Sequence, residues 1–225
     1  MVKIFMNFNP SRPVVLIIRD GWGKNPEPDQ NGYNAVFLAK KPVDDRLMRD
    51  YPNTLVKTCG LDVGLPPCTM GNSEVGHQNI GAGRVVDQEI VRINKMIESG
   101  EFYRNRALLG ALEFARQHQG RLHLMGLVSD AGVHAMIEHL VACLEFARRN
   151  EFKNVFIHAF TDGRDTPPTS GVGFIRQIEQ ACARIGVGRI ATVAGRYYSM
   201  DRDKRWERVQ RAYECLVAGK GRGVE

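Results

Sequence analysis

The stretch Arg121-Leu122-His123-Leu124-Met125-Gly126-Leu127-Val128-Ser129-Asp130 decides the fold of this chain. It is a short, mostly apolar run that ends in two polar residues, which is typical of a β-strand. A helical pattern of apolar residues follows at 136–147, and the strand–helix–strand pattern is repeated by 155–160, 173–185 and 189–194. Alternation at this spacing predicts βαβ units and a parallel sheet, so the expected fold class is α/β.

Helical periods also occur outside this alternating region. Apolar residues at 90–97 and 108–115 predict two helices before it, and 204–218 predicts a final amphipathic helix. Shorter helices are expected near 35–40 and 43–50. The pair Pro66-Pro67 forbids a helix, so 51–69 is expected to be irregular.

The run Val14-Val15-Leu16-Ile17-Ile18 is β-branched or aliphatic throughout. A continuous apolar run predicts a strand buried on both faces of a parallel sheet. Asp20 follows it, at the edge where open α/β sheets collect ligands. The pattern changes after 81–86, where we expect a domain boundary.

Composition narrows the class of protein. The chain has 225 residues, 43% of them hydrophobic, which is enough for one large domain or slightly more. No apolar run approaches the ~20 residues that a membrane span needs. The five cysteines are scattered and never spaced as a metal or redox pair, which indicates reduced thiols and a cytoplasmic location. The net charge of +6 comes without an aromatic-interleaved basic stripe, so nucleic-acid binding is disfavoured.

Polar clusters follow three successive predicted strands. They are Ser129–His134, Thr161–Asp165 and Gly195–Arg202. Because the carboxyl ends of parallel strands share one edge of the sheet, these clusters are expected around one crevice. Three arginines there would suit a ligand with phosphate and carboxylate groups, since the guanidinium fork binds both. The expected members are Asp130, His134, Arg164, Asp165, Arg196 and Arg202.

Ordinary structural roles remain open for several of these residues. Asp130 and Asp162 are also typical of turns or helix caps, and His134 is typical of a helix start. Arg202 also fits an exposed helix face. Asp165 is expected either to orient an arginine or to accept a hydrogen bond from a substrate hydroxyl.

A second candidate region is Met70-Gly71-Asn72-Ser73-Glu74-Val75-Gly76-His77. Glycines allow a close approach of the backbone to a ligand, and a hydroxyl on such a turn is accessible for chemistry. The alternative is a surface turn capped by Asn72 and Ser73.

These segments, in order, resemble those of the cofactor-independent (2,3-bisphosphoglycerate-independent) phosphoglycerate mutases, in the alkaline phosphatase-like superfamily. The matching segments are Leu16–Trp22, Gly71–Gly83, Ser129–His134, Asp162–Asp165 and Gly195–Trp206. The resemblance extends from about 13 to 219. It implies interconversion of 3-phosphoglycerate and 2-phosphoglycerate, an isomerase activity of glycolysis and gluconeogenesis, through a phosphoserine intermediate.

The resemblance also implies roles for individual residues. Ser73 matches the nucleophile and a metal ligand, and Asp20 matches a metal ligand of a site for two divalent ions, implied to be Mn²⁺. The implied substrate contacts are His134, Arg164, Asp165, Arg196 and Arg202. The chain departs from the family at Arg19, usually aliphatic, and at Ala131 and Met136, often Gly and His.

The family architecture implies two domains in this chain. Residues 1–85 match the start of an alkaline phosphatase-like domain, with a strand at 14–18 and the serine loop at 70–77. Residues 86–225 match most of a transferase-type, substrate-binding domain inserted into it. The family's other metal-binding Asp and His residues lie in a carboxyl-terminal half without a match here, so the chain resembles a fragment, a truncated product or a split subunit. On its own it is expected to be inactive and to need that half as a partner.

Three other functions remain open from the sequence. A metal-dependent phosphomonoesterase or a phosphopentomutase-like relative would share the metal and serine features, although the strand-end arginines disfavour it. A non-catalytic phosphoglycerate-binding module is favoured by the unmatched half. Nucleic-acid binding is the least favoured.

Overall fold

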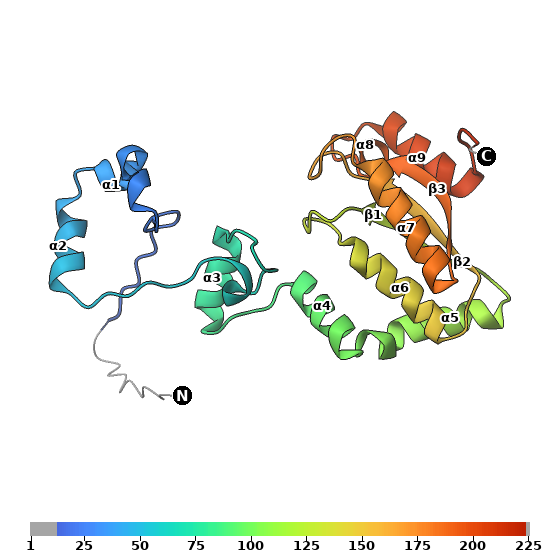
Figure 1. The fold of residues 1–225 in the computed structure, drawn as a ribbon, viewed down its shortest axis with the longest axis horizontal. Coiled ribbons are helices and arrows are strands. Elements are labelled where there is room, and N and C mark those ends of the chain that lie inside the picture. The colour runs from blue at the N-terminus through green and yellow to red at the C-terminus, as the bar shows by residue number, and fades with distance from the viewer. Residues whose placement is uncertain (1–12, 224–225) are drawn as a thin grey trace. The chain divides into compact units, whose positions relative to one another are not determined.

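The computed structural model of this chain describes residues 13–223 (Figure 1). They divide into two compact units, one formed by 13–63 with 67–86 and the other by 64–66 with 87–223. Within the described part of the chain, no helix combines the length and the apolar character needed to cross a membrane.

The first unit is built from short helices joined by loops. They are the 3₁₀ helices η1 (Pro28–Tyr33) and η2 (Gly60–Val63) and the α-helices α1 (Ala35–Leu38), α2 (Pro42–Asp50) and α3 (Ser73–Ala82). Asn34 starts α1 by accepting a hydrogen bond from the Phe37 amide, and a proline opens α2, where its missing N–H costs nothing. The helices predicted near 35–40 and 43–50 are therefore confirmed.

The predicted strand at 14–18 is wrong for this structure. Residues 13–19 have no regular secondary structure, and the side chains from Val14 to Ile18 are 43–79% exposed. A buried strand needs neighbours that pair with its backbone, and the described residues of this unit contain no strand. Arg19 instead binds Asp44 of α2 at 2.6 Å and stacks over Trp22.

The loop before Ser73 passes very close to another backbone segment. A Cβ atom at Gly71 would lie 1.8 Å from the Thr58 carbonyl oxygen, so only glycine fits there. The Gly60 amide donates to the Thr69 carbonyl at 2.9 Å across the same two segments. This contact fixes the backbone that leads into α3.

The second unit contains a three-stranded parallel sheet. Its strands are β1 (Leu122–Val128), β2 (Val155–Thr161) and β3 (Arg189–Gly195), in the order β1-β2-β3. Val128 pairs with Thr161 and Thr161 pairs with Gly195, so all three strands end at the same edge. The predicted α/β fold with a parallel sheet is confirmed.

Helices connect and flank these strands. The helix α6 (Ile137–Arg149) joins β1 to β2, and α7 (Gly171–Ile185) joins β2 to β3. The two lie next to each other on one side of the sheet (Figure 1). The remaining elements are α4 (Glu89–Ser99), η3 (Phe102–Arg104), α5 (Arg106–Gln117), α8 (Arg196–Ser199) and α9 (Trp206–Ala218).

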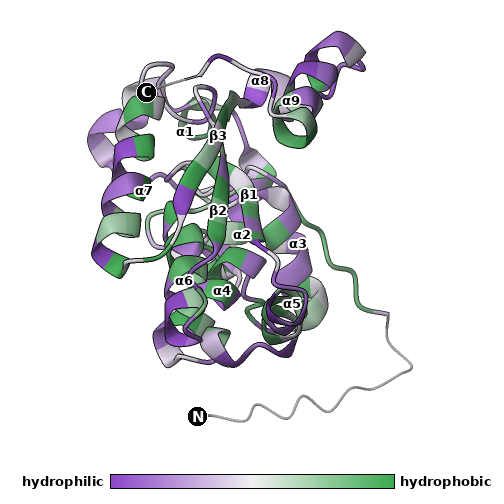
Figure 2. Cartoon of the chain, turned by 90° about the vertical axis from the view of Figure 1, so that its right-hand side faces the viewer, coloured by the Kyte–Doolittle hydropathy of each residue, from purple (hydrophilic) through white to green (hydrophobic). Residues whose placement is uncertain are grey.

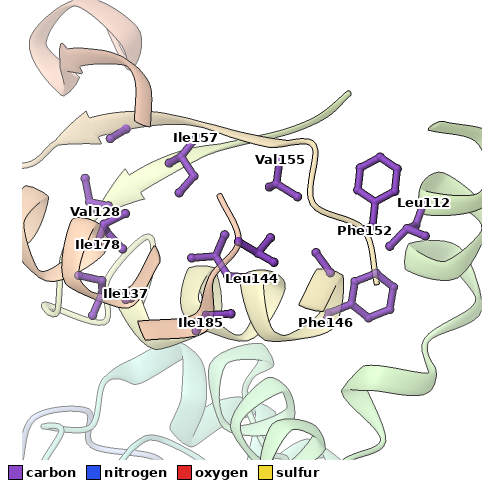
Figure 3. Packing of buried hydrophobic residues seen from close by; sticks show 14 of the residues in the cluster. Leu112, Val128, Ile137, Leu144, Phe146, Phe152, Val155, Ile157, Ile178 and Ile185 are labelled. Atoms are coloured by element: carbon purple, nitrogen blue, oxygen red, sulfur yellow. The ribbon is translucent and has the colours of Figure 1, made fainter. Parts of the chain in front are cut away.

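The hydrophobic core lies between the sheet and these crossover helices (Figure 3). Leu144 of α6, Ile157 of β2 and Ile178 of α7 are each 0% exposed. Close packing of this kind holds the strands in register and thereby fixes the positions of the strand ends.

The other face of the sheet carries a polar chain across all three strands. His123 Nδ1 lies 2.9 Å from His158 Nε2, and His158 Nδ1 lies 2.8 Å from Thr192 Oγ1. Burial lowers the pKa of His158, and the neighbouring His123 lowers it further. The strands are otherwise mostly hydrophobic, whereas the helices carry mixed surfaces (Figure 2).

Candidate functional site

Polar side chains from the three strand ends meet at the carboxyl edge of the sheet. Ser129 follows β1, Asp162 follows β2, and Arg196 follows β3 as the first residue of α8. Ser129 Oγ donates to Asp162 Oδ2 at 2.8 Å, and Arg196 Nη1 donates to Asp162 Oδ1 at 2.8 Å. We call the group formed by these residues and their neighbours the strand-end cluster. Its members are Ser129, His134, Asp162, Arg164, Asp165 and Arg196.

Asp162 is the centre of the strand-end cluster. Its side chain is 0% exposed, and Oδ1 also accepts hydrogen bonds from the amides of Arg164 and Asp165, both at 3.0 Å. Burial alone would raise the pKa of Asp162. The hydrogen bonds from the Asp165 amide, the Arg196 guanidinium, the Arg164 amide and Ser129 together lower it to about 2. The carboxylate is therefore ionised at neutral pH.

Arg196 lies between two carboxylates. The same Nη1 atom that binds Asp162 also donates to Asp165 Oδ2 at 2.7 Å. The hydrogen bonds that it donates to Asp165 and Asp162 raise the pKa of Arg196, and its side chain is only 11% exposed. The guanidinium is thus held in place before any ligand arrives.

Asp165 lies between the buried Asp162–Arg196 pair and the surface of the protein. Its side chain is 21% exposed, and its Oδ2 lies 3.9 Å from His134 Nε2. The His134 side chain is 39% exposed, so a ligand can reach it. When His134 is protonated, this contact becomes an ion pair.

The backbone between Asp162 and Asp165 is a tight turn. Gly163 has φ of +78°, a conformation that disfavours side chains, and its amide lies 3.4 Å from Thr166 Oγ1. This turn presents Arg164 to solvent. Among residues 13–223, no carboxylate or carbonyl forms an ion pair or hydrogen bond with the Arg164 guanidinium.

Two predicted members are not joined to the strand-end cluster. Within the described range, no hydrogen bond or ion pair links Asp130 or Arg202 with it, so their place in the site stays a prediction. The segment around Arg202 has its own anchor, because Asp201 accepts from the Arg205 amide at 2.9 Å and pairs with Arg208 at 3.1 Å.

Ser73 lies in the first unit, at the first position of α3 rather than on the irregular loop that the sequence suggested. Asn72 caps this helix by accepting from the Val75 amide at 3.0 Å, and the Ser73 side chain is exposed. Glycines at 76 and 81 disfavour a helix, so the sequence does not predict one at 73–82.

His77 lies one turn along the same helix. Its Nδ1 atom is 2.8 Å from the Ser73 carbonyl oxygen and 3.3 Å from Ser73 Oγ. A carbonyl oxygen only accepts, so Nδ1 must carry the proton. His77 Nδ1 in this arrangement cannot take the proton of the serine hydroxyl.

The predicted metal ligands do not form a complete metal site here. Asp20 and Ser73 are both exposed, and no hydrogen bond joins them within residues 13–223. The described residues contain no group of three or more His, Cys, Asp or Glu side chains that could hold a metal ion. The donor set present is thus too small for the divalent ions that the resemblance implies.

Asp162 and Ser129 have a larger structural role than their sequence context predicts. The sequence predicts only a turn or cap role for Asp162 and none for Ser129, whereas both are buried at the centre of the cluster. The available signal was their position directly after two strands, with a glycine following Asp162.

Comparison with known proteins identifies a family and several relatives. A family model described as "BPG-independent PGAM N-terminus" matches residues 93–225. A 2,3-bisphosphoglycerate-independent phosphoglycerate mutase of Rhodopirellula baltica is 52% identical over 98% of this chain and 41% of its own length. The enzyme of the same name from Acetivibrio thermocellus is 55% identical over 92% of this chain and 40% of its own length.

A solved structure agrees with these sequence matches. Phosphoglycerate mutase of Leishmania mexicana, crystallised at low cobalt concentration, is 38% identical, with a TM-score of 0.63. The match covers 91% of this chain and 38% of that one. The chain therefore spans about two fifths of the length of the relatives it matches.

Proposed function

The chain belongs to the BPG-independent phosphoglycerate mutase family, as part of its amino-terminal region, and from this premise we propose that it binds phosphoglycerate and supplies the nucleophile for its isomerisation. The observation that carries the proposal is the strand-end cluster. A guanidinium fixed by two carboxylates lies there with an accessible imidazole, and the adjoining turn carries the exposed side chain of Arg164, which has no partner among the described residues.

Substrate binding is assigned to the exposed side of that cluster. Arg164 and His134 would meet the phosphate or carboxylate of phosphoglycerate first, because both are exposed and Arg196 lies deeper. Asp165 would accept a hydrogen bond from a substrate hydroxyl or keep Arg196 in place. Arg202 is retained as a proposed further contact on the family resemblance alone.

Ser73 is assigned to phosphoryl transfer. Its oxygen would attack phosphorus, break the ester bond to one hydroxyl oxygen of glycerate and form phosphoserine. The second hydroxyl oxygen of the reoriented glycerate would then attack the same phosphorus and release Ser73, so the phosphoryl group moves within the substrate. The position of Ser73 at the start of α3 supports this role, because the first amides of a helix stabilise an attached phosphate.

We assign the activation of the Ser73 hydroxyl to a divalent metal ion. The family resemblance implies that this ion is Mn²⁺. Such an ion would lower the pKa of the serine hydroxyl when bound. The donor set in the described residues does not fit a complete site, so Asp20 and Ser73 would need ligands from the part of the family architecture that the chain does not span. We propose that this part acts with the chain, in the same or a second polypeptide.

The proposed roles of the two domains and the proposed cellular location follow from the family to which the chain belongs. Residues 1–85 would belong to a phosphatase-like domain and 86–225 to a transferase-type domain. A cytoplasmic location fits a glycolytic substrate and cysteines that form no disulfide in the structure.

One alternative is favoured by a specific observation. Because the described residues lack a complete metal site, the chain alone would act as a phosphoglycerate-binding module without turnover. This alternative keeps the strand-end cluster and removes the catalytic role of Ser73.

The test of the proposed function is a Ser73→Ala substitution in a chain completed with the carboxyl-terminal part of the Acetivibrio thermocellus relative. The parent fusion should convert 3-phosphoglycerate to 2-phosphoglycerate with added Mn²⁺, and the 225-residue chain alone should not. Ser73→Ala should abolish turnover without loss of folding, because the side chain is exposed and no other group can form the phosphoenzyme.

Ser99→Ala provides the control, since Ser99 is an exposed serine at the end of α4 in the second unit. It should retain full turnover. A Ser73→Ala fusion with parental activity would contradict the assignment of the nucleophile, and turnover by the 225-residue chain alone would contradict the need for the remaining part.

A further inference from the structure

The Asp162 side chain itself is out of reach of a substrate. Its side chain is 0% exposed, and both of its oxygens are occupied by groups of the protein itself. Any role in binding must therefore pass through the residues that it holds.

Those residues come from all three strand ends. Oδ2 accepts from Ser129 after β1, and Oδ1 accepts from Arg196 after β3. The same Oδ1 atom also accepts from the amides of Arg164 and Asp165 in the turn after β2. The buried Asp162 carboxylate thus fixes the Arg196 guanidinium and also the turn that carries Arg164.

The geometry makes Asp162 different from Asp165, its neighbour in the turn. Asp165 binds the same Nη1 atom of Arg196, but it is partly exposed and a ligand can replace it. Asp162 cannot be displaced by a ligand in this way, since it is inaccessible. It remains the fixed acceptor for Arg196 whether or not the site is occupied.

We propose that Asp162, supported by Ser129, is a positioning residue that holds Arg196 and the Arg164–Asp165 turn in the geometry that binds phosphoglycerate. The ligand identity in this statement rests on the proposed function. The positioning itself concerns contacts within the chain.

Positioning and simple electrostatics predict opposite effects of Asp162→Asn. The amide oxygen can still accept from the turn, but the buried one of the two charged partners of Arg196 is lost. If Asp162 acted only through its charge, removing it would strengthen the binding of an anionic ligand. If it positions Arg196, the variant binds more weakly, by about tenfold for one charge-assisted contact that is no longer aligned.

The experiment uses the 225-residue chain and two measurements. NMR of the arginine side chains reports whether rotation of the Arg196 guanidinium about Cζ–Nε is slowed, with no ligand present. Calorimetric titration with 3-phosphoglycerate at constant ionic strength reports affinity. In the parent the Arg196 rotation should be slow. In Asp162→Asn it should be fast, and affinity should fall about tenfold.

Asn154→Ala is the matched control. The Asn154 side chain donates to the Gly120 carbonyl at 3.0 Å and links the starts of β1 and β2, as Ser129 and Asp162 link their ends. It should leave the Arg196 rotation and the affinity at parental values, even where it lowers the unfolding temperature.

The outcomes separate the two proposals. Slow Arg196 rotation together with unchanged or tighter binding in a folded Asp162→Asn chain would overturn the positioning role. Absence of binding by the parent would overturn the proposed ligand, and the NMR comparison would then decide the positioning role by itself. If Asp162→Asn does not fold, Ser129→Ala decides: faster Arg196 rotation supports the inference, and parental rotation overturns it.

Discussion

At the scale of single residues, the strand-end cluster consists of an inner and an outer layer of charge. The inner layer is Asp162 with Arg196, 0% and 11% exposed, and the outer layer is Asp165, His134 and Arg164. Buried charges are tolerated only when they are paired and hydrogen-bonded, and the described residues contain no buried side-chain nitrogen or oxygen without a partner. The inner pair thereby lies beneath the exposed side chains of the outer layer and is hydrogen-bonded to it through Asp165.

The buried carboxylate predicts a specific dependence of stability on pH. The pKa of Asp162 is about 2 in the folded chain, below the ~3.9 of an unfolded aspartate. A lowered folded pKa contributes stability that is fully present above the unfolded pKa and is lost as the pH falls toward the folded one. The parent should therefore lose about 2 kcal/mol of unfolding free energy, relative to Asp162→Asn, between about pH 5 and pH 2.

Urea unfolding of the two chains at a series of pH values measures this difference. Comparing parent with variant cancels the other groups that titrate in the range. A difference in unfolding free energy that stays constant from pH 5 to pH 2 would contradict the assigned ionisation of Asp162.

Part of the site could be predicted at this scale. The rule that polar residues after parallel strands share an edge brought together His134, Arg164, Asp165 and Arg196. The sequence could not tell which aspartate faces inward, because Asp162 and Asp165 lie three residues apart in one turn and the turn geometry decides. The contacts of His77 also depend on the α3 helix, which the sequence analysis did not predict.

At the scale of elements, regular patterns were predicted well and irregular ones were not. The strands expected at 121–128, 155–160 and 189–194 match β1, β2 and β3 to within a residue or two, because apolar runs bounded by polar residues leave few alternatives. The four-residue helix α8 is too short to show a period. The expected strand at 14–18 failed because an apolar run forms a strand only where another strand pairs with it.

The packing of the crossover helices against the sheet is expected to contribute to the stability of the second unit. Leu144 of α6 is 0% exposed at the centre of the core (Figure 3), so Leu144→Ala should lower the unfolding free energy by about 2–5 kcal/mol. Val172→Ala in α7 is the control, because that side chain is 62% exposed and should cost little. Chemical denaturation measures both, and equal losses in the two variants would contradict the core as described.

At the scale of the whole molecule, the proposed binding and the proposed chemistry belong to different units. The strand-end cluster lies within 87–223, whereas Ser73 and Asp20 lie in the other unit. The cluster draws all its contacts from the second unit, so ligand binding does not require a complete catalytic site around Ser73. Anion binding should therefore be present in this chain even where turnover is absent.

Calorimetric titration of the 225-residue chain measures whether the strand-end cluster binds phosphoglycerate, as we propose. Binding of 3-phosphoglycerate is expected in the range of about millimolar to tens of micromolar, because the ordering and desolvation costs offset much of the charge-assisted gain. Glycerol, a neutral molecule, should not bind. Arg164→Ala should weaken binding about fivefold to tenfold through loss of the exposed guanidinium.

Arg116→Ala is the matched control, since Arg116 is an exposed arginine near the end of α5, just before β1 begins at the opposite edge of the sheet. This variant should bind 3-phosphoglycerate like the parent, while Arg164→Ala should bind it several-fold more weakly. Equal affinity of the parent and Arg164→Ala, or equal heats for 3-phosphoglycerate and glycerol, would contradict the claim that the strand-end cluster is the binding site.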